Sequence, residues 1–205
     1  MIVQELNIES RIFDKIKRRP AGTLFFPEQF RGFGKNSAIR KALQRLVEGG
    51  KITRVAQGMY VLPKESSLIG KILPGAEEIA ITIAKRDKAA IIPTGVQALN
   101  LLGLSTQIPM KVVYLTNGAA RIVRVGQQTI KFKKTTPKNL LAKGPISSLV
   151  IQALKEIGKD NATEQELNKI MIHLKNEKEG NIIHDSKLAP VWIANILIEA
   201  LVIEK

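Results

Sequence analysis

Cysteine is absent from this 205-residue sequence, and aromatic residues make up only 4% of it. Without cysteine there is no disulfide, thiolate metal site, iron–sulfur cluster or cysteine nucleophile. The scarcity of aromatic residues argues against binding of single strands on stacked aromatic platforms. No apolar stretch reaches the roughly 18 residues of a membrane span, and the charged N-terminal segment is unlike a secretory signal. These absences predict a cytoplasmic protein without a membrane partner.

Residues for catalysis are also few. Aspartate occurs only at positions 14, 87, 160 and 185, so no D-x-D pair is present to hold Mg²⁺. The two histidines have no metal-ligand spacing around them. The segment from Gly32 to Ser37 departs from a phosphate-binding loop at two positions. We therefore expect no metal, no cofactor and no enzymatic activity. An enzyme that acts on nucleic acid is kept as an alternative, after the two binding functions given at the end of this subsection.

Positive charge dominates the first two thirds of the chain. The net charge is +14; residues 1–65 hold 13 Lys and Arg against 6 Asp and Glu, and residues 66–145 hold 12 against 3. Residues 146–205 hold 7 against 9. Such a balance favours a polyanionic partner, nucleic acid before an acidic membrane surface. The alternative is a solvated basic surface.

Residues 1–65 are predicted to form a winged helix-turn-helix domain. The expected elements are a helix over 8–19, one helical turn at 27–30, a helix over 36–48 capped by Asn36, and strands over 51–55 and 59–62. A helix, a short helix, a third helix and a hairpin in this order are the layout of that fold. Its third helix presents polar and basic side chains to the major groove.

Residues 66–205 are predicted to form a mixed α+β domain, so the whole chain is assigned to the α+β class. Residues 65–74 are expected to be a linker. The expected elements that follow are helices over 77–86 and 94–102 and strands over 89–92, 111–116, 120–125 and 129–133. Helices over 146–157, 164–175 and 188–204 form the C-terminal part, and the last is apolar nearly all round. Such a helix is buried in its own domain or in a dimer interface.

The outward face of the helix over 36–48 is the strongest candidate for DNA contact. Its predicted DNA-binding residues are Lys35, Asn36, Ser37, Arg40, Lys41, Gln44 and Arg45. Others near the hairpin tip and at the end of the first helix are Arg54, Gln57, Lys17, Arg18 and Arg19. The alternative is an ordinary exposed face, because Arg, Lys and Gln are good helix formers on any surface.

A second set of cations lies on the predicted strands of the middle segment: Arg121, Arg124, Lys131, Lys133 and Lys134. Arg121, Lys131 and Lys133 have odd numbers, so alternation along the strands is expected to place several of them on one sheet face. They are predicted to extend a nucleic-acid surface. Binding of RNA and simple solubility are the alternatives.

The segments RIFDKIKRRPAGTLFFPEQF and ALQRLVEGGKITRVAQGMYVLP resemble the N-terminal winged helix of AbiEi-family antitoxins of type IV toxin–antitoxin systems. The segment IIPTGVQALNLLGLSTQIPMKVVYLTNG is similar to the domain that follows in that family. The resemblance covers roughly residues 8–157 and rests on apolar and glycine positions. It implies a bacterial autorepressor that binds inverted repeats in its own promoter. It also implies that the middle and C-terminal segments counteract a cognate toxin without a stable complex.

Two functions of different classes therefore remain. The first is a sequence-specific, double-stranded DNA-binding transcriptional repressor, an antitoxin-like autoregulator that binds DNA as a homodimer. The second is a protein-interaction module in which the winged helix is only a scaffold and the basic surface meets an acidic protein. Binding to DNA at low salt discriminates between them.

Overall fold

A computed structural model of the chain describes residues 2–68, 70–107 and 109–202. The protein is of the mixed α+β class, as predicted. The chain divides into two compact units; unit 1 comprises residues 1–82 and 123–126, and unit 2 comprises residues 83–122 and 127–205. Unit 1 therefore extends beyond the expected boundary at 65, into helix α3 (Ala76–Asp87).

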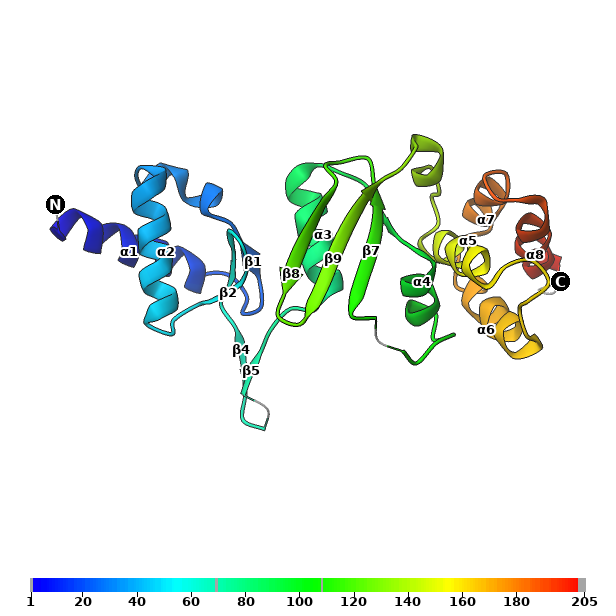
Figure 1. Cartoon of the computed structure of the whole chain (residues 1–205), viewed down its shortest axis with the longest axis horizontal. Helices are drawn as coiled ribbons and strands as arrows, with labels where there is room; N and C mark the ends of the chain where they lie inside the picture. The colour runs from blue at the N-terminus through cyan, green and yellow to red at the C-terminus, as the bar shows by residue number, and fades with distance from the viewer. Residues whose placement is uncertain (1, 69, 108, 203–205) are drawn as a thin grey trace. The chain divides into compact units, whose positions relative to one another are not determined.

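Unit 1 begins with the predicted helices and hairpin strands in the predicted order, but its first helix begins at Ile2 and a two-residue strand follows that helix. The elements are α1 (Ile2–Lys17), β1 (Leu24–Phe25), the 3₁₀ helix η1 (Pro27–Phe33), α2 (Asn36–Glu48), β2 (Thr53–Ala56) and β3 (Met59–Val61). The three strands form an antiparallel sheet in the order β1-β3-β2 (Figure 1).

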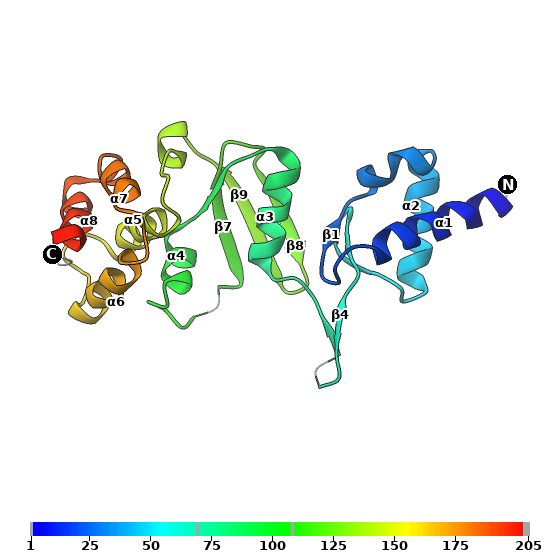
Figure 2. The same cartoon turned by 180° about the vertical axis from the view of Figure 1, so that it is seen from behind.

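The core of unit 1 forms where the apolar stripes of two helices meet. Ile12 and Ile16 of α1 and Ile39 and Leu43 of α2 are at most 1% exposed, and α1 packs across α2 (Figure 2). These positions recur at intervals of four residues, which places them on one side of each helix. Aromatic rings of β1, η1 and β3 complete the core. Packing of this core fixes which face of α2 turns outward.

The segment after β3 is a hairpin and not the linker that the sequence predicts. Strands β4 (Lys64–Ser66) and β5 (Gly70–Ile72) pair antiparallel, with Lys64 opposite Ile72. Every residue of β5 is exposed, so the strand carries no alternation of buried and exposed side chains. Without that alternation the sequence gives no strand signal, and the backbone pairing alone defines the hairpin.

The second sheet contains β6 (Ile91–Pro93), β7 (Lys111–Thr116), β8 (Arg121–Val125) and β9 (Gln128–Lys134) in the order β6-β7-β9-β8. Strands β7 and β9 are parallel, while β6 and β7 are antiparallel. Tyr114 of β7 and Phe132 of β9 are opposite each other and stack at 6.1 Å between ring centroids. Their side chains, with Val112 and Ile130, form a buried face of the sheet.

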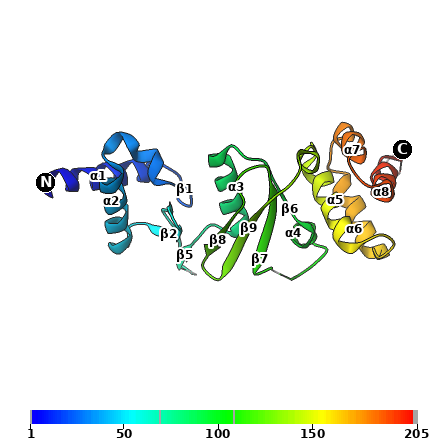
Figure 3. The same ribbon diagram turned by 45° about the horizontal axis from the view of Figure 1, so that its top comes forward.

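The described residues of the C-terminal part form four helices where the sequence predicts three, and Figure 3 shows how they are arranged. They are α5 (Pro145–Ile157), α6 (Glu164–Leu174), α7 (Glu179–Ser186) and α8 (Val191–Val202), and they share a core with α4 (Gly95–Leu101). Helix α7 was not predicted because its eight residues contain a single buried large apolar side chain, Ile182, which gives no helical period.

Helix α8 buries one face in its own domain and leaves apolar side chains of the other exposed, so burial in a dimer interface stays a prediction. Ile193 and Leu197 are fully buried, whereas Val191 is 78% and Val202 is 67% exposed. Among the described residues, no helix has the length and apolar character that crossing a membrane requires.

Candidate nucleic-acid interface

Helix α2 has two chemically distinct faces, because its apolar residues all turn into the core of unit 1. Its buried residues are Ile39, Ala42, Leu43 and Leu46. The side chains of Ser37, Arg40, Lys41 and Gln44 are exposed. They are spaced by three and four residues and so share the opposite side of the helix. The amphipathic pattern in the sequence is thus confirmed, and the predicted contact residues lie together on a surface.

The start of α2 differs from the prediction. Lys35, not Asn36, is the N-cap residue, and no side chain accepts a hydrogen bond from the first turn. Asn36 already lies in the helix, so the prediction of an asparagine cap is wrong. The first turn also contains no acidic residue. Its backbone N–H groups and the positive end of the helix dipole therefore favour an anion.

The cations on this face are not neutralised by carboxylates. Among the described residues, no Asp or Glu oxygen lies within the 4.0 Å of an ion pair from Lys35, Arg40 or Lys41. Gln44 is held differently, since its Nε2 donates to Glu48 Oε1 at 2.9 Å. Arg45 is half-buried and has contacts of its own. Three positive side chains of α2 and its N-cap thus remain available to a ligand.

The β2–β3 hairpin presents two further predicted residues. Arg54 is exposed on β2, where its Nε donates to the Ala56 carbonyl oxygen at 3.4 Å. Gln57 is exposed in the turn that connects the strands, and Gly58 completes that turn with φ +68°. A positive φ is rare for residues other than glycine. The tight turn therefore holds both polar side chains close to the tip of the hairpin.

The predicted cations at the end of α1 have unequal surroundings. Lys17 Nζ is 3.0 Å from Asp14 Oδ1, and Arg19 Nη1 donates to Gln29 Oε1 at 2.8 Å. Arg18 is exposed without an ion pair to any described residue. Of the three, only Arg18 resembles the unpaired cations of α2.

The sequence-based prediction missed a basic hollow beside Arg18. It has a volume of about 400 Å³ and is lined by Arg11, Asp14, Lys15, Arg18 and Phe33. Arg11 lies over the Phe33 ring at 4.6 Å from its centroid, and Lys15 Nζ is 5.2 Å from the same centroid. Cations at positions 11, 15 and 18 share one helix face, so their spacing was the signal that could have identified this hollow.

The second set of predicted cations lies on both faces of the sheet and not on one. Arg121 forms an ion pair with Asp87 and lies over the Phe132 ring at 5.4 Å. Burial lowers the pKa of Arg121, and the positive charge of Arg86 lowers it further. Lys131 and Lys133 alternate with Phe132 along β9 and therefore lie on the other face. The expectation that Arg121 shares their face is wrong, because residue parity does not carry over from one strand to the next.

The other two cations of that set are exposed. Arg124 alternates with Arg121 along β8, and Lys134 is the last residue of β9. Lys131 is half-buried, whereas Lys133 is exposed. Lys131 and Lys133 thus share a face of β9, and Arg124 lies on the side of β8 away from Arg121.

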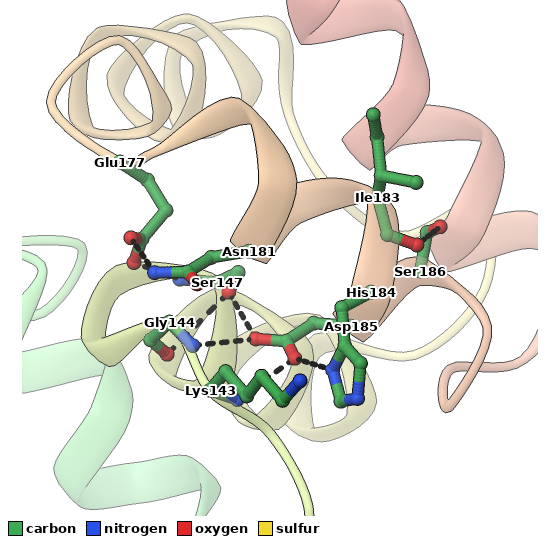
Figure 4. Close-up of polar contacts among 9 residues, drawn as sticks. All are labelled: Lys143, Gly144, Ser147, Glu177, Asn181, Ile183, His184, Asp185 and Ser186. Atoms are coloured by element: carbon green, nitrogen blue, oxygen red, sulfur yellow. Dashed lines mark hydrogen bonds and ion pairs between the residues drawn. The ribbon is translucent and has the colours of Figure 1, made fainter.

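A polar cluster at the start of α5 has the residue types of a hydrolase site but another arrangement (Figure 4). The carboxylate of Asp185 is fully buried and accepts hydrogen bonds from Ser147 Oγ at 2.5 Å and from His184 Nδ1 at 2.8 Å. Activation of a serine requires the histidine between serine and carboxylate. Here the carboxylate lies between the other two, so the histidine does not reach the serine through this contact.

The same carboxylate closes the N-terminus of α5. Asp185 also accepts from the backbone N–H groups of Lys143 and Gly144, at 2.8 and 2.9 Å. Burial raises the pKa of Asp185, but the hydrogen bonds from His184, Ser147 and these amides outweigh it and hold the pKa below its ordinary value. The cluster therefore caps a helix.

Glu177 acts on the first turn of the same helix. Its Oε2 accepts from the Ile146 N–H at 2.8 Å, and its Oε1 accepts from Asn181 Nδ2 at 2.8 Å. Burial raises the pKa of Glu177, and the hydrogen bonds lower it to a net value below the ordinary one. Both carboxylates were missed by the sequence analysis, since the backbone groups they accept from around the start of α5 are 30 to 42 positions away in the chain.

The other histidine is also engaged in the fold. His173 Nε2 lies 3.0 Å from the carbonyl oxygen of Leu102, where α4 ends, and Lys169 Nζ donates to the Gly103 carbonyl at 3.1 Å. Cationic and N–H groups are favourable at the C-terminus of a helix. Within the described residues, no group of three or more His, Asp or Glu side chains is placed to hold a metal ion.

The comparisons with known proteins identify a family without an assigned function. No curated protein matches the chain. Residues 11–182 match the family of unknown function DUF6088, and this segment covers most of both units. The protein therefore belongs to the DUF6088 family.

Proposed function

We propose that the protein is a sequence-specific double-stranded DNA-binding transcriptional repressor. In this proposal the N-terminal elements form a winged helix-turn-helix, with α2 as the recognition helix and the β2–β3 hairpin as the wing. The order of α1, η1, α2 and the hairpin supports this assignment, as does the net charge of +14. We further propose that the protein binds and does not catalyse.

One observation carries the proposal: the outward face of α2 is exposed and polar, and Lys35, Arg40 and Lys41 lack carboxylate partners among the described residues. Lys17 differs from these cations, because its ammonium group is paired with Asp14. Unpaired cations at a helix start that has no acidic residue are suited to phosphate.

The side chains of this face match the chemistry of base reading. Arginine binds the O6 and N7 atoms of guanine with two hydrogen bonds, and glutamine binds the N6 and N7 atoms of adenine in the same way. We assign these roles to Arg40 and Gln44. Lys35, Lys41 and the backbone N–H groups of the first turn contact phosphates and set the register of α2 on the duplex.

The resemblance to AbiEi-family antitoxins extends the proposal. We propose an antitoxin-like autoregulator of a type IV toxin–antitoxin operon, which binds inverted repeats in its own promoter as a homodimer. Two half-sites about one helical turn apart fit such a dimer. The middle and C-terminal segments then counteract a toxin without a stable complex.

A gel-shift titration tests the proposal. Purified full-length protein is titrated against the DNA upstream of its own gene, with random duplex as competitor, at about 50 and 200 mM salt. We expect discrete complexes that resist the competitor and weaken steeply with salt. Equal displacement by random duplex contradicts sequence-specific recognition. No shift at the lower salt contradicts DNA binding and favours the protein-interaction module.

A double variant separates base reading from charge. Replacing Arg40 and Gln44 by Ala should lower the preference for the promoter over random duplex by about 1–3 kcal/mol per lost base contact. A matched control, Lys175→Ala, removes an exposed cation of unit 2 and should leave the preference unchanged. Unchanged discrimination in the double variant contradicts the assignment of α2 as the reading helix.

A further inference from the structure

A small hollow lies in unit 2 between η2 (Pro137–Leu140) and one side of α5. It has a volume of about 20 Å³ and is lined by Lys138, Asn139, Ala142, Ser148, Ile151, Gln152, Lys155 and Leu188. A space of this size takes one water-sized group at its base. It accepts an oxygen atom of a group that enters from solvent, and it is too small for a whole nucleotide.

The base of the hollow holds hydrogen-bonding groups without partners. Ser148 is only 9% exposed, yet its hydroxyl forms no hydrogen bond with the described part of the chain. The amide of Gln152 is likewise unpartnered there. Ser148, Gln152 and Lys155 follow one another at intervals of four and three residues, so they lie along one side of α5. Neither group is among the described buried polar atoms that lack a partner, so both reach solvent and can donate a hydrogen bond to a ligand there.

Two positive charges flank these groups. Lys138 and Lys155 are exposed at the rim, and neither has a carboxylate within 4.0 Å among the residues that the structure describes. Partial burial lowers the pKa of Lys155, and the charge of Lys138 lowers it further. The two ammonium groups therefore repel each other, and an anion between them would remove that repulsion.

We propose that this hollow binds a phosphoryl group. Lys138 and Lys155 supply the charge, while Ser148 Oγ and the Gln152 amide donate hydrogen bonds to the phosphoryl oxygens. Two sources carry this chemistry, a free phosphate compound and the backbone of a nucleic acid. The site belongs to unit 2 alone and does not depend on DNA binding by unit 1.

Titration of the ¹⁵N-labelled full chain with inorganic phosphate tests the site. Sodium chloride at the same ionic strength is the reference. We expect saturable shifts of backbone amide resonances at residues 138–139 and 148–155 with phosphate but not with chloride. An equal response to chloride, or shifts that do not saturate, overturns the proposal.

Variants locate the site. Lys138→Gln combined with Lys155→Gln should weaken phosphate binding about tenfold or more, because both charges are lost. Ser148→Ala should weaken it about threefold, as expected for one hydrogen bond. The control combines Lys159→Gln with Lys175→Gln, two exposed lysines elsewhere in unit 2, and should bind as the wild type does. Equal weakening in the control overturns the assignment to this hollow, and Trp192 fluorescence checks that each variant is folded.

The source of the phosphoryl group follows from two further titrations. If a random duplex shifts the same resonances, and the double variant lowers the salt dependence of duplex binding by about two phosphate contacts, the source is a nucleic-acid backbone. If only inorganic phosphate and a 5′-mononucleotide shift them, it is a free phosphate compound. If none of the three probes shifts them, the proposal is overturned.

Discussion

Polar side chains of α2 and of the C-terminal helices differ in whether they have partners within the chain. In unit 1, Arg40 and Lys41 lack ion-pair partners among the described residues. In unit 2, Asp185 and Glu177 accept hydrogen bonds from backbone N–H groups where α5 begins. Lys169 donates a hydrogen bond to a backbone carbonyl group where α4 ends. For these residues the partner, and not the residue type, separates side chains that hold the fold together from side chains available to a ligand. Gln44 differs, because it must release Glu48 to contact a base.

The largest effect is expected from Asp185→Ala. The change leaves the buried Gly144 N–H and the Ser147 hydroxyl without their acceptor, and each unsatisfied donor is costly. We expect the free energy of unfolding of unit 2 to fall by about 3 kcal/mol. Urea unfolding followed by the fluorescence of Trp192, the single tryptophan, measures this loss.

A matched variant removes a carboxylate that has no such role. Glu199 is exposed on α8, and Glu199→Ala should change the free energy of unfolding by less than about 0.5 kcal/mol. DNA binding by Asp185→Ala should stay unchanged at temperatures where unit 2 remains folded. A midpoint of unfolding equal to that of the wild type would show that Asp185 does not cap α5.

The opposite result is expected when two cations of unit 1 are removed. Lys35→Ala combined with Lys41→Ala should leave stability unchanged, because neither side chain has an ion-pair partner in the described chain. It should weaken binding of promoter and random duplex alike, by about tenfold at low salt, and reduce the salt slope by about two contacts. Fluorescence anisotropy at several salt concentrations measures both quantities. A loss of stability without a change in the salt slope would show that these two lysines stabilise the fold and do not contact phosphates.

The sequence predicts α2 well and the caps of α5 poorly, for a physical reason. The apolar residues of α2 recur with the helical period, so a local pattern defines both its length and its outward face. The contacts of Asp185 and Glu177 with the backbone where α5 begins join residues 30 to 42 positions apart, and no local pattern records them. The β4–β5 hairpin was missed because its strands are exposed and carry no alternation.

Acid should destabilise unit 2 through the two carboxylates at the start of α5, Asp185 and Glu177. Their hydrogen bonds hold both pKa values below the ordinary 4.5 of Glu177 and 3.8 of Asp185. Because the folded pKa is the lower one, the stabilisation is complete above these ordinary values and is lost as the pH falls through the folded values. Urea unfolding monitored by Trp192 at successive pH values should therefore show decreasing stability below about pH 4.5.

Glu177→Gln sharpens this prediction. The variant should be less stable than the wild type near neutral pH, and its stability should fall less steeply with acid, because one of the two titrating caps is gone. The control is Glu199→Gln, which alters an exposed carboxylate of α8 and should retain the acid dependence of the wild type. Identical pH profiles for wild type and Glu177→Gln would contradict a capping role for this carboxylate.

The smallest expected effect on stability comes from the residues that begin α6 and α2. Thr163 caps α6, where its hydroxyl accepts from the Glu166 N–H and the Glu166 carboxylate accepts from the Thr163 N–H. Thr163→Ala should therefore lower the free energy of unfolding by about 1 kcal/mol, while Thr163→Ser should preserve it.

Asn36 begins α2 without capping it, so Asn36→Ala should cost less than about 0.5 kcal/mol and should weaken promoter binding instead. Urea unfolding and anisotropy on the same two variants measure both effects. Thr163 and Asn36 are both exposed polar residues at a helix start, but only Thr163 caps its helix. Equal stability losses in the two alanine variants would therefore contradict the assignment of Asn36 to a ligand on the ground that it has no partner.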